Sequence, residues 1–102
     1  EETFGPVTSV YPIADFEEAV ARANDTNFGL SAAIFTRDIT KALQFSQRVR
    51  TGMVHINAPT IADEPHVPFG GIGDSGFGRE GTDIDIDTFT EWKWITVQLP
   101  VS

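Results

Sequence analysis

The 102 residues carry 15 acidic and 7 basic side chains, a formal net charge of −8, and no cysteine. So acidic a chain repels phosphate groups, which argues against nucleic acid and anionic membranes as partners. The lack of cysteine excludes disulfides and a thiol nucleophile, and we expect a cytoplasmic protein. No apolar run approaches the roughly 20 residues that span a bilayer, so we expect one small globular unit. The chain begins with glutamate rather than methionine, which suggests a partial chain.

The first third of the chain predicts a strand and then a helix. Residues 7–13 (VTSVYPI) are rich in β-branched and aromatic types, which favour a strand. Asp15 and Glu18 have the spacing of a capping box at the start of a helix. Turn-forming residues at 24–29 end that helix. Its apolar face recurs at helical spacing and consists of Phe16, Ala19, Val20 and Ala23.

The middle third predicts strand, helix and strand. Residues 30–36 (LSAAIFT) are mostly apolar, as in a strand buried on both faces, and residues 53–57 (MVHIN) favour another strand. Between them, Asp38 predicts the N-cap of a helix and Gly52 its C-terminal cap. Connections this short predict right-handed βαβ units and a parallel sheet of three strands. The expected buried side of this second helix holds Ile39, Ala42, Leu43 and Val49.

A long irregular segment follows over residues 58–81 and holds most of the glycines, and loops of this length usually have a function. A short helix is expected within residues 79–91. Residues 92–99 (WKWITVQL) predict a final strand that is apolar on both faces and needs covering by this chain or a partner. The predicted fold class is therefore α/β: a parallel βαβαβ segment, a long Gly/Pro-rich loop and an outlying C-terminal strand.

Three short motifs are better explained by structure than by chemistry. Residues 71–76 match the GxGxxG pattern of dinucleotide-binding loops, but no predicted strand precedes them and no helix opens at the third glycine. The acidic run at 83–87 (DIDID) lacks the glycine and terminal glutamate of a calcium loop. His55 and His66 lack the spacing of metal ligands, so we expect an ordinary strand histidine, an ordinary loop histidine and no metal site.

Four stretches, in this order, resemble the aldehyde dehydrogenase superfamily and cover almost the whole chain. They are residues 1–7 (EETFGPV), 24–38 (NDTNFGLSAAIFTRD), 52–60 running on to 68–71 and 75–80 (GMVHINAPT, PFGG, SGFGRE), and 89–97 (FTEWKWITV). The resemblance implies that residues 1–90 are the C-terminal part of a catalytic domain and that 91–102 are an oligomerisation strand and tail. It also implies a homo-oligomer held by the strand that begins at Trp92 and ends at Leu99.

The resemblance also implies roles for three side chains. Glu2 would accept hydrogen bonds from the nicotinamide ribose of NAD or NADP, and Phe4 would pack near the nicotinamide ring. Phe69 resembles the aromatic wall of the family's aldehyde tunnel. The alternatives are a solvated surface acid at Glu2 and an ordinary core anchor at Phe69. Gly70 and Gly71 are expected to permit a tight backbone path that a Cβ would block.

The expected reaction of the intact enzyme is oxidation of an aldehyde to a carboxylate. Residues 57–60 (NAPT), with Glu64 ahead of Phe69, look most similar to members that act on aromatic aldehydes of the benzaldehyde, vanillin or salicylaldehyde type. The family's nucleophilic cysteine and general-base glutamate lie upstream of the first stretch. We therefore expect no catalytic residue in this chain and no activity from the chain alone. The alternative function is a structural and oligomerisation module without catalysis of its own.

Overall fold

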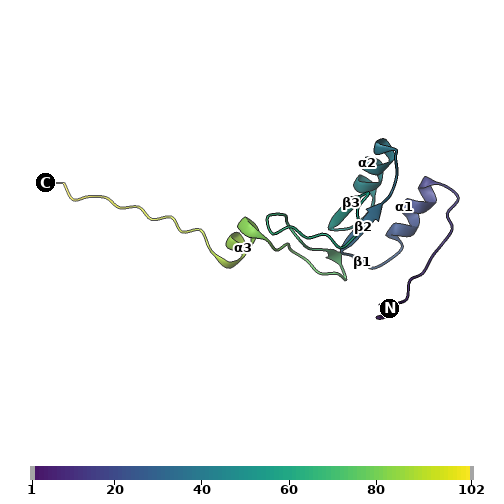
Figure 1. Ribbon diagram of the computed structural model, residues 1–102. Coiled ribbons are helices and arrows are strands. Elements are labelled where there is room, and N and C mark those ends of the chain that lie inside the picture. The colour runs from purple at the N-terminus through teal and green to yellow at the C-terminus, as the bar shows by residue number, and fades with distance from the viewer. Residues whose placement is uncertain (1, 102) are drawn as a thin grey trace.

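The computed structural model describes residues 2–101 and has a folded end and an extended end (Figure 1). The sheet and two helices gather at one end, and the chain after α3 (Thr82–Phe89) runs away from them without regular structure. The longest axis is 81 Å and the radius of gyration is 20.4 Å, whereas a compact domain of this length has about 13 Å. The accessible surface of 8862 Å² likewise exceeds the roughly 5,700 Å² of a compact protein of this mass.

A parallel pair of strands, β2 (Ser31–Ile34) and β3 (Met53–Ile56), forms the centre of the folded end. The two strands pair in register from their first residues to their last. Helix α2 (Ile39–Arg48) connects them, which confirms the predicted βαβ unit. Its predicted N-cap is confirmed as well, because the Asp38 carboxylate accepts a hydrogen bond from the Lys41 backbone N–H at 3.1 Å.

The core lies where α1 (Phe16–Asn24) and α2 pack on one face of this strand pair. Ile39 and Leu43 were predicted to be buried, and this was wrong: they are 62% and 52% exposed. Phe45 lies in the core instead, because the stripe of α2 that faces the sheet runs through positions 42, 45 and 49 at helical spacing. The buried apolar side chains are Val20, Ala42, Phe45 and Val49.

The predicted capping box of α1 is present with a shift of one residue. The Asp15 carboxylate accepts a hydrogen bond from the Glu18 N–H at 2.8 Å, as expected. The Glu18 carboxylate accepts from the Ala14 N–H at 2.9 Å rather than from Asp15. The bond from Ala14, and then that from the Arg22 side chain, hold the pKa of Glu18 below its ordinary value. Both side chains thus satisfy backbone donors at the helix start.

Asn24 ends α1 and joins it to the end of α2. Its Nδ2 donates to the Arg48 carbonyl at 2.9 Å, and its Oδ1 accepts from the Arg50 N–H at 2.7 Å. Arg48 also pairs with Glu17 on α1, and this side-chain hydrogen bond holds the pKa of Glu17 below its ordinary value. Because the ion pair is exposed, it adds little to stability. The amide of Asn24 fixes the two helix ends through backbone groups.

Two predicted strands are not strands in this structure. Residues 7–13 and 92–99 are extended, but no described strand pairs with either of them. The predicted three-stranded parallel sheet therefore contains two strands. The helix expected within residues 79–91 is confirmed as α3. Within residues 2–101, no helix combines the length and the apolar character that crossing a membrane requires.

Candidate functional site

A hollow of about 390 Å³ separates β3 from the loop that follows it. Residues 52–55 form one wall, and residues 62–64 and 67–69 form the other. Since Val54 packs against the core, its neighbours Met53 and His55 present their side chains to the opposite face of the strand pair. Phe69 lines the hollow and lies outside the core cluster. The volume is in the range of roughly 300–1,000 Å³ that is typical of small-molecule sites.

The loop that carries Phe69 is ordered by backbone pairing that the sequence did not reveal. Phe69 and Glu80 exchange two backbone hydrogen bonds, of 2.9 and 2.8 Å. Beyond Phe69, β4 (Ile72–Gly73) pairs antiparallel with β1 (Phe28–Gly29). Residues 58–81 were predicted to be irregular, and the pairing could not be foreseen because each paired stretch has only one or two residues. The loop is therefore paired with itself at Phe69 and Glu80, and it is fastened to the folded end by β4.

Two glycine backbones meet where this loop crosses the start of β3. A Cβ built on Gly52 would lie 1.7 Å from the carbonyl oxygen of Gly70. The Gly52 N–H donates to the Gly29 carbonyl at 2.9 Å, and the Gly29 N–H donates to Ser75 Oγ at 3.0 Å. Gly52 was predicted to cap α2, and this was wrong, since that cap is Val49. Gly52 is required instead for close approach of two backbones.

The tight path expected at Gly70 and Gly71 is confirmed. A Cβ on Gly70 would lie 2.6 Å from the Gly78 carbonyl oxygen, and one on Gly71 would lie 2.7 Å from the Cβ of Ser75. Arg79 adds a further restraint, because its guanidinium donates to the Gly71 carbonyl at 2.9 Å. These contacts leave the backbone near Phe69 little freedom to move.

His55 is a feature that sequence reasoning missed. It lines the same hollow as Phe69, and its Nε2 is buried without a hydrogen-bond partner among the described residues. Leaving a buried polar group unpaired costs about 1–3 kcal/mol, so such an atom is uncommon. The only signal in the sequence was the alternation of His55 with Val54 along a strand. Residues 2–101 contain no cluster of three acidic or histidine side chains that could hold a metal ion.

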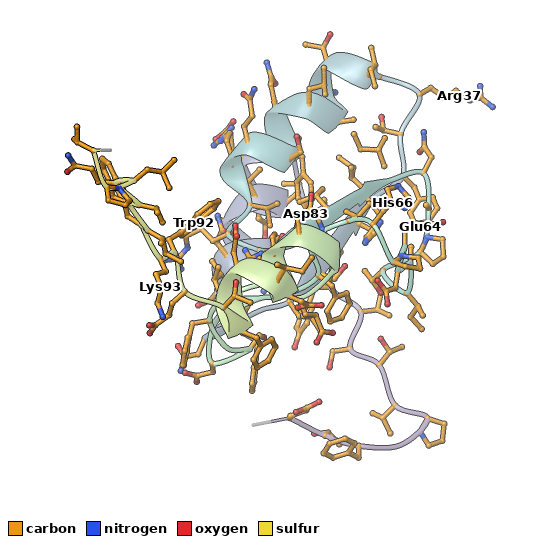
Figure 2. All side chains as sticks on the ribbon, turned by 90° about the vertical axis from the view of Figure 1, so that its left-hand side faces the viewer. Arg37, Glu64, His66, Asp83, Trp92 and Lys93 are labelled. Atoms are coloured by element: carbon orange, nitrogen blue, oxygen red, sulfur yellow. The ribbon has the colours of Figure 1, made fainter. Side chains whose placement is uncertain are left out.

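The loop and the C-terminal segment present their side chains on different sides of the molecule. Figure 2 shows Glu64 and His66 together on the loop, across the view from Trp92 and Lys93. Trp92 is 97% exposed, so none of residues 2–101 covers it. The hollow beside Phe69 is thus formed without any contribution from the C-terminal segment.

The predicted cofactor residues lie apart from Phe69. Glu2 is exposed and lines a second hollow of about 620 Å³ together with Thr51 and Ser75. Phe4 is 87% exposed, so its ring is open to a flat apolar partner. A carboxylate at the edge of an open hollow can accept two hydrogen bonds from a diol, which fits a ribose. The two hollows share no lining residue.

Comparison with known proteins decides the family. Residues 1–95 match the sequence profile of the aldehyde dehydrogenase family. The chain belongs to this family. It is 49% identical over 98 residues to the vanillin dehydrogenase of Pseudomonas sp. strain HR199, a match that covers 96% of this chain and 20% of that protein.

Solved structures of aldehyde dehydrogenases contain the same fold. The salicylaldehyde dehydrogenase of Pseudomonas putida G7, complexed with salicylaldehyde, superposes with a TM-score of 0.88 at 42% identity, over 100% of this chain and 21% of that chain. A Mycobacterium tuberculosis aldehyde dehydrogenase complexed with NAD+ gives 0.79 at 40% identity, over 85% and 18%. The chain thus spans about a fifth of the length of the relatives it matches, and its fold is confirmed as a part of theirs.

We predict that Gly52→Ala lowers the free energy of unfolding of the intact protein by at least about 2 kcal/mol, because the new methyl group would overlap the Gly70 carbonyl. Urea unfolding followed by far-ultraviolet circular dichroism measures the change. Thr51→Ser is the control, since it keeps the neighbouring hydroxyl and adds no atom. Equal stability of the two variants would show that Gly52 and Gly70 are not in contact.

Proposed function

We propose that the protein containing this chain oxidises aromatic aldehydes to carboxylates with NAD or NADP as the hydride acceptor. The observation that carries the proposal is the similarity, over 96% of the chain, to enzymes named for vanillin, benzaldehyde and salicylaldehyde. The hollow beside Phe69 supports it, because Met53, Val67, Pro68 and Phe69 give it largely apolar walls. Such walls suit an aromatic ring and exclude water from it.

In this proposal the residues of this chain bind and orient the aldehyde and the cofactor, and they do not take part in the chemical reaction. Phe69 supplies a flat apolar wall for the ring of the aldehyde. Glu2 accepts hydrogen bonds from the ribose hydroxyls of the cofactor, and Phe4 packs beside its nicotinamide. The bound cofactor supplies the site that takes up hydride.

In this proposal the reacting groups lie outside residues 1–102. The chain contains no cysteine, and the covalent catalysis expected of the family requires a thiolate. The chain by itself therefore binds parts of the two substrates without turning them over. The cytoplasmic location and the lack of nucleic acid and membrane partners stay predictions.

The intact reading frame is expected to reduce NAD or NADP in the presence of benzaldehyde or vanillin, and residues 1–102 alone are expected not to. Absorbance of the reduced cofactor measures both reactions. An aliphatic aldehyde such as hexanal serves as the substrate control and should give a lower kcat/KM. Turnover by the purified 102-residue chain, or an intact protein inactive on every aldehyde, would contradict the proposal.

A second role, in assembly, is favoured by the C-terminal segment. Trp92, Trp94, Ile95 and Leu99 are between 74% and 97% exposed, and they lie on both faces of an extended backbone. A segment of this kind can add to the edge of a sheet and bury both faces there. We propose that residues 91–102 form the oligomerisation strand and tail of a homo-oligomer, and that residues 1–90 belong to the catalytic domain.

Ile95→Asp in the intact protein is expected to reduce the molar mass measured by size-exclusion chromatography with light scattering. The carboxylate would have to be buried at the subunit contact, which costs several kcal/mol. Gln47→Asp adds the same charge at an exposed position of α2 and should leave the mass unchanged. If Ile95→Asp has the mass of the unsubstituted protein, the segment does not hold the oligomer together.

A further inference from the structure

Asn57 turns the chain out of the sheet and into the loop that carries Phe69. Its backbone N–H donates to the Ile34 carbonyl at 2.8 Å, which extends the pairing of β2 and β3 beyond the last residue of β3. Its φ is +56°, and it is the one non-glycine residue among residues 2–101 with a positive φ. Asparagine tolerates this left-handed conformation better than most residues, because its short side chain can bond to nearby backbone.

The side chain of Asn57 holds this turn against β2. Its Oδ1 accepts from the Thr36 N–H at 2.8 Å, and its Nδ2 donates to the Thr36 carbonyl at 3.0 Å. A neighbouring strand would make the same two bonds to Thr36, and here the amide replaces it at the point where the chain leaves the sheet. The left-handed backbone and the paired amide therefore specify one direction for residues 58–69.

Two further contacts keep that direction along the loop. The Ser31 hydroxyl at the start of β2 donates to the Thr60 carbonyl at 3.2 Å. At the far end, the Gly70 carbonyl lies against Gly52, just before β3. The loop is thus attached at both ends, and its first attachment is the amide of Asn57. Asn57 connects β3, which forms one wall of the hollow, to the loop that forms the other.

We infer that Asn57 is a positioning residue for the aldehyde. It acts through the wall formed by residues 62–64 and 67–69 and does not contact the aldehyde itself. The inference rests on the proposed function, since it assigns the hollow beside Phe69 to the aldehyde. Asn57 does not line the hollow, and it does not line the hollow that contains Glu2. Loss of its amide is therefore expected to alter the KM for aldehyde and to leave the KM for the cofactor unchanged.

The test uses the intact enzyme with Asn57→Gly and Asn57→Asp. Glycine adopts the left-handed backbone without strain, so Asn57→Gly keeps the turn and removes the amide contacts alone. Aspartate retains an oxygen for the Thr36 N–H and loses the donor. Asn24→Gly is the matched control, because Asn24 also bridges a backbone carbonyl and a backbone N–H and lines neither hollow.

We expect Asn57→Gly to raise the KM for benzaldehyde on the order of tenfold, since a displaced wall misplaces the ring. Asn57→Asp should have a smaller effect, and the KM for NAD should stay within about twofold in both. Asn24→Gly should lower the thermal midpoint without a selective change in either KM.

Three outcomes would overturn the inference: equal changes in both KM values, no change in either, or an Asn57→Gly enzyme that fails to fold while Asn24→Gly folds. The last outcome would assign Asn57 to stability alone. An unsubstituted enzyme without aldehyde oxidation would instead contradict the proposed function, so the two failures are distinguishable.

Discussion

The contact between the backbones of Gly52 and Gly70 is the constraint on which the hollow depends. It brings the loop against the chain at the residue just before β3, with no side chain between the two backbones. Asn57 turns the chain at the other end of the same strand. Residues 52–55 therefore form one wall and the loop forms the other, and His55 and Phe69 line the hollow between them. The shape of this site is therefore set by the path of the backbone and not by any single reactive residue.

Much of the folded end could be predicted because its causes are local. Asp15 and Asp38 cap helices through backbone donors three residues away, so the sequence alone locates both helix starts. The parallel pair follows from two apolar runs separated by one helix. The prediction of the buried side of α2 was only half right. Phe45 and Leu43 both fit an apolar stripe, and packing against the sheet determines which of the two is buried.

The remaining features of the structure depend on contacts with residues that are distant in the sequence or that belong to another chain. Residues 7–13 and 92–99 have strand composition, but a strand exists only where another backbone pairs with it. No local pattern could reveal that Gly52 lies against Gly70 or that Nε2 of His55 is unpartnered. The roles of Glu2, Phe4 and Phe69 came from resemblance to a family. The structure adds that Glu2 and Phe69 line different hollows and that Phe4 lines neither of them.

Amide hydrogen exchange of the intact protein, with and without an aromatic carboxylate product, tests the central claim most directly. The N–H groups of Gly52 and Asn57 donate to backbone carbonyls, so slow exchange is expected there in both states. The bound carboxylate should slow amide exchange across residues 62–69, because it fills the hollow that these residues line. Rapid exchange at Gly52, or ligand protection that leaves residues 62–69 unchanged, would contradict the account.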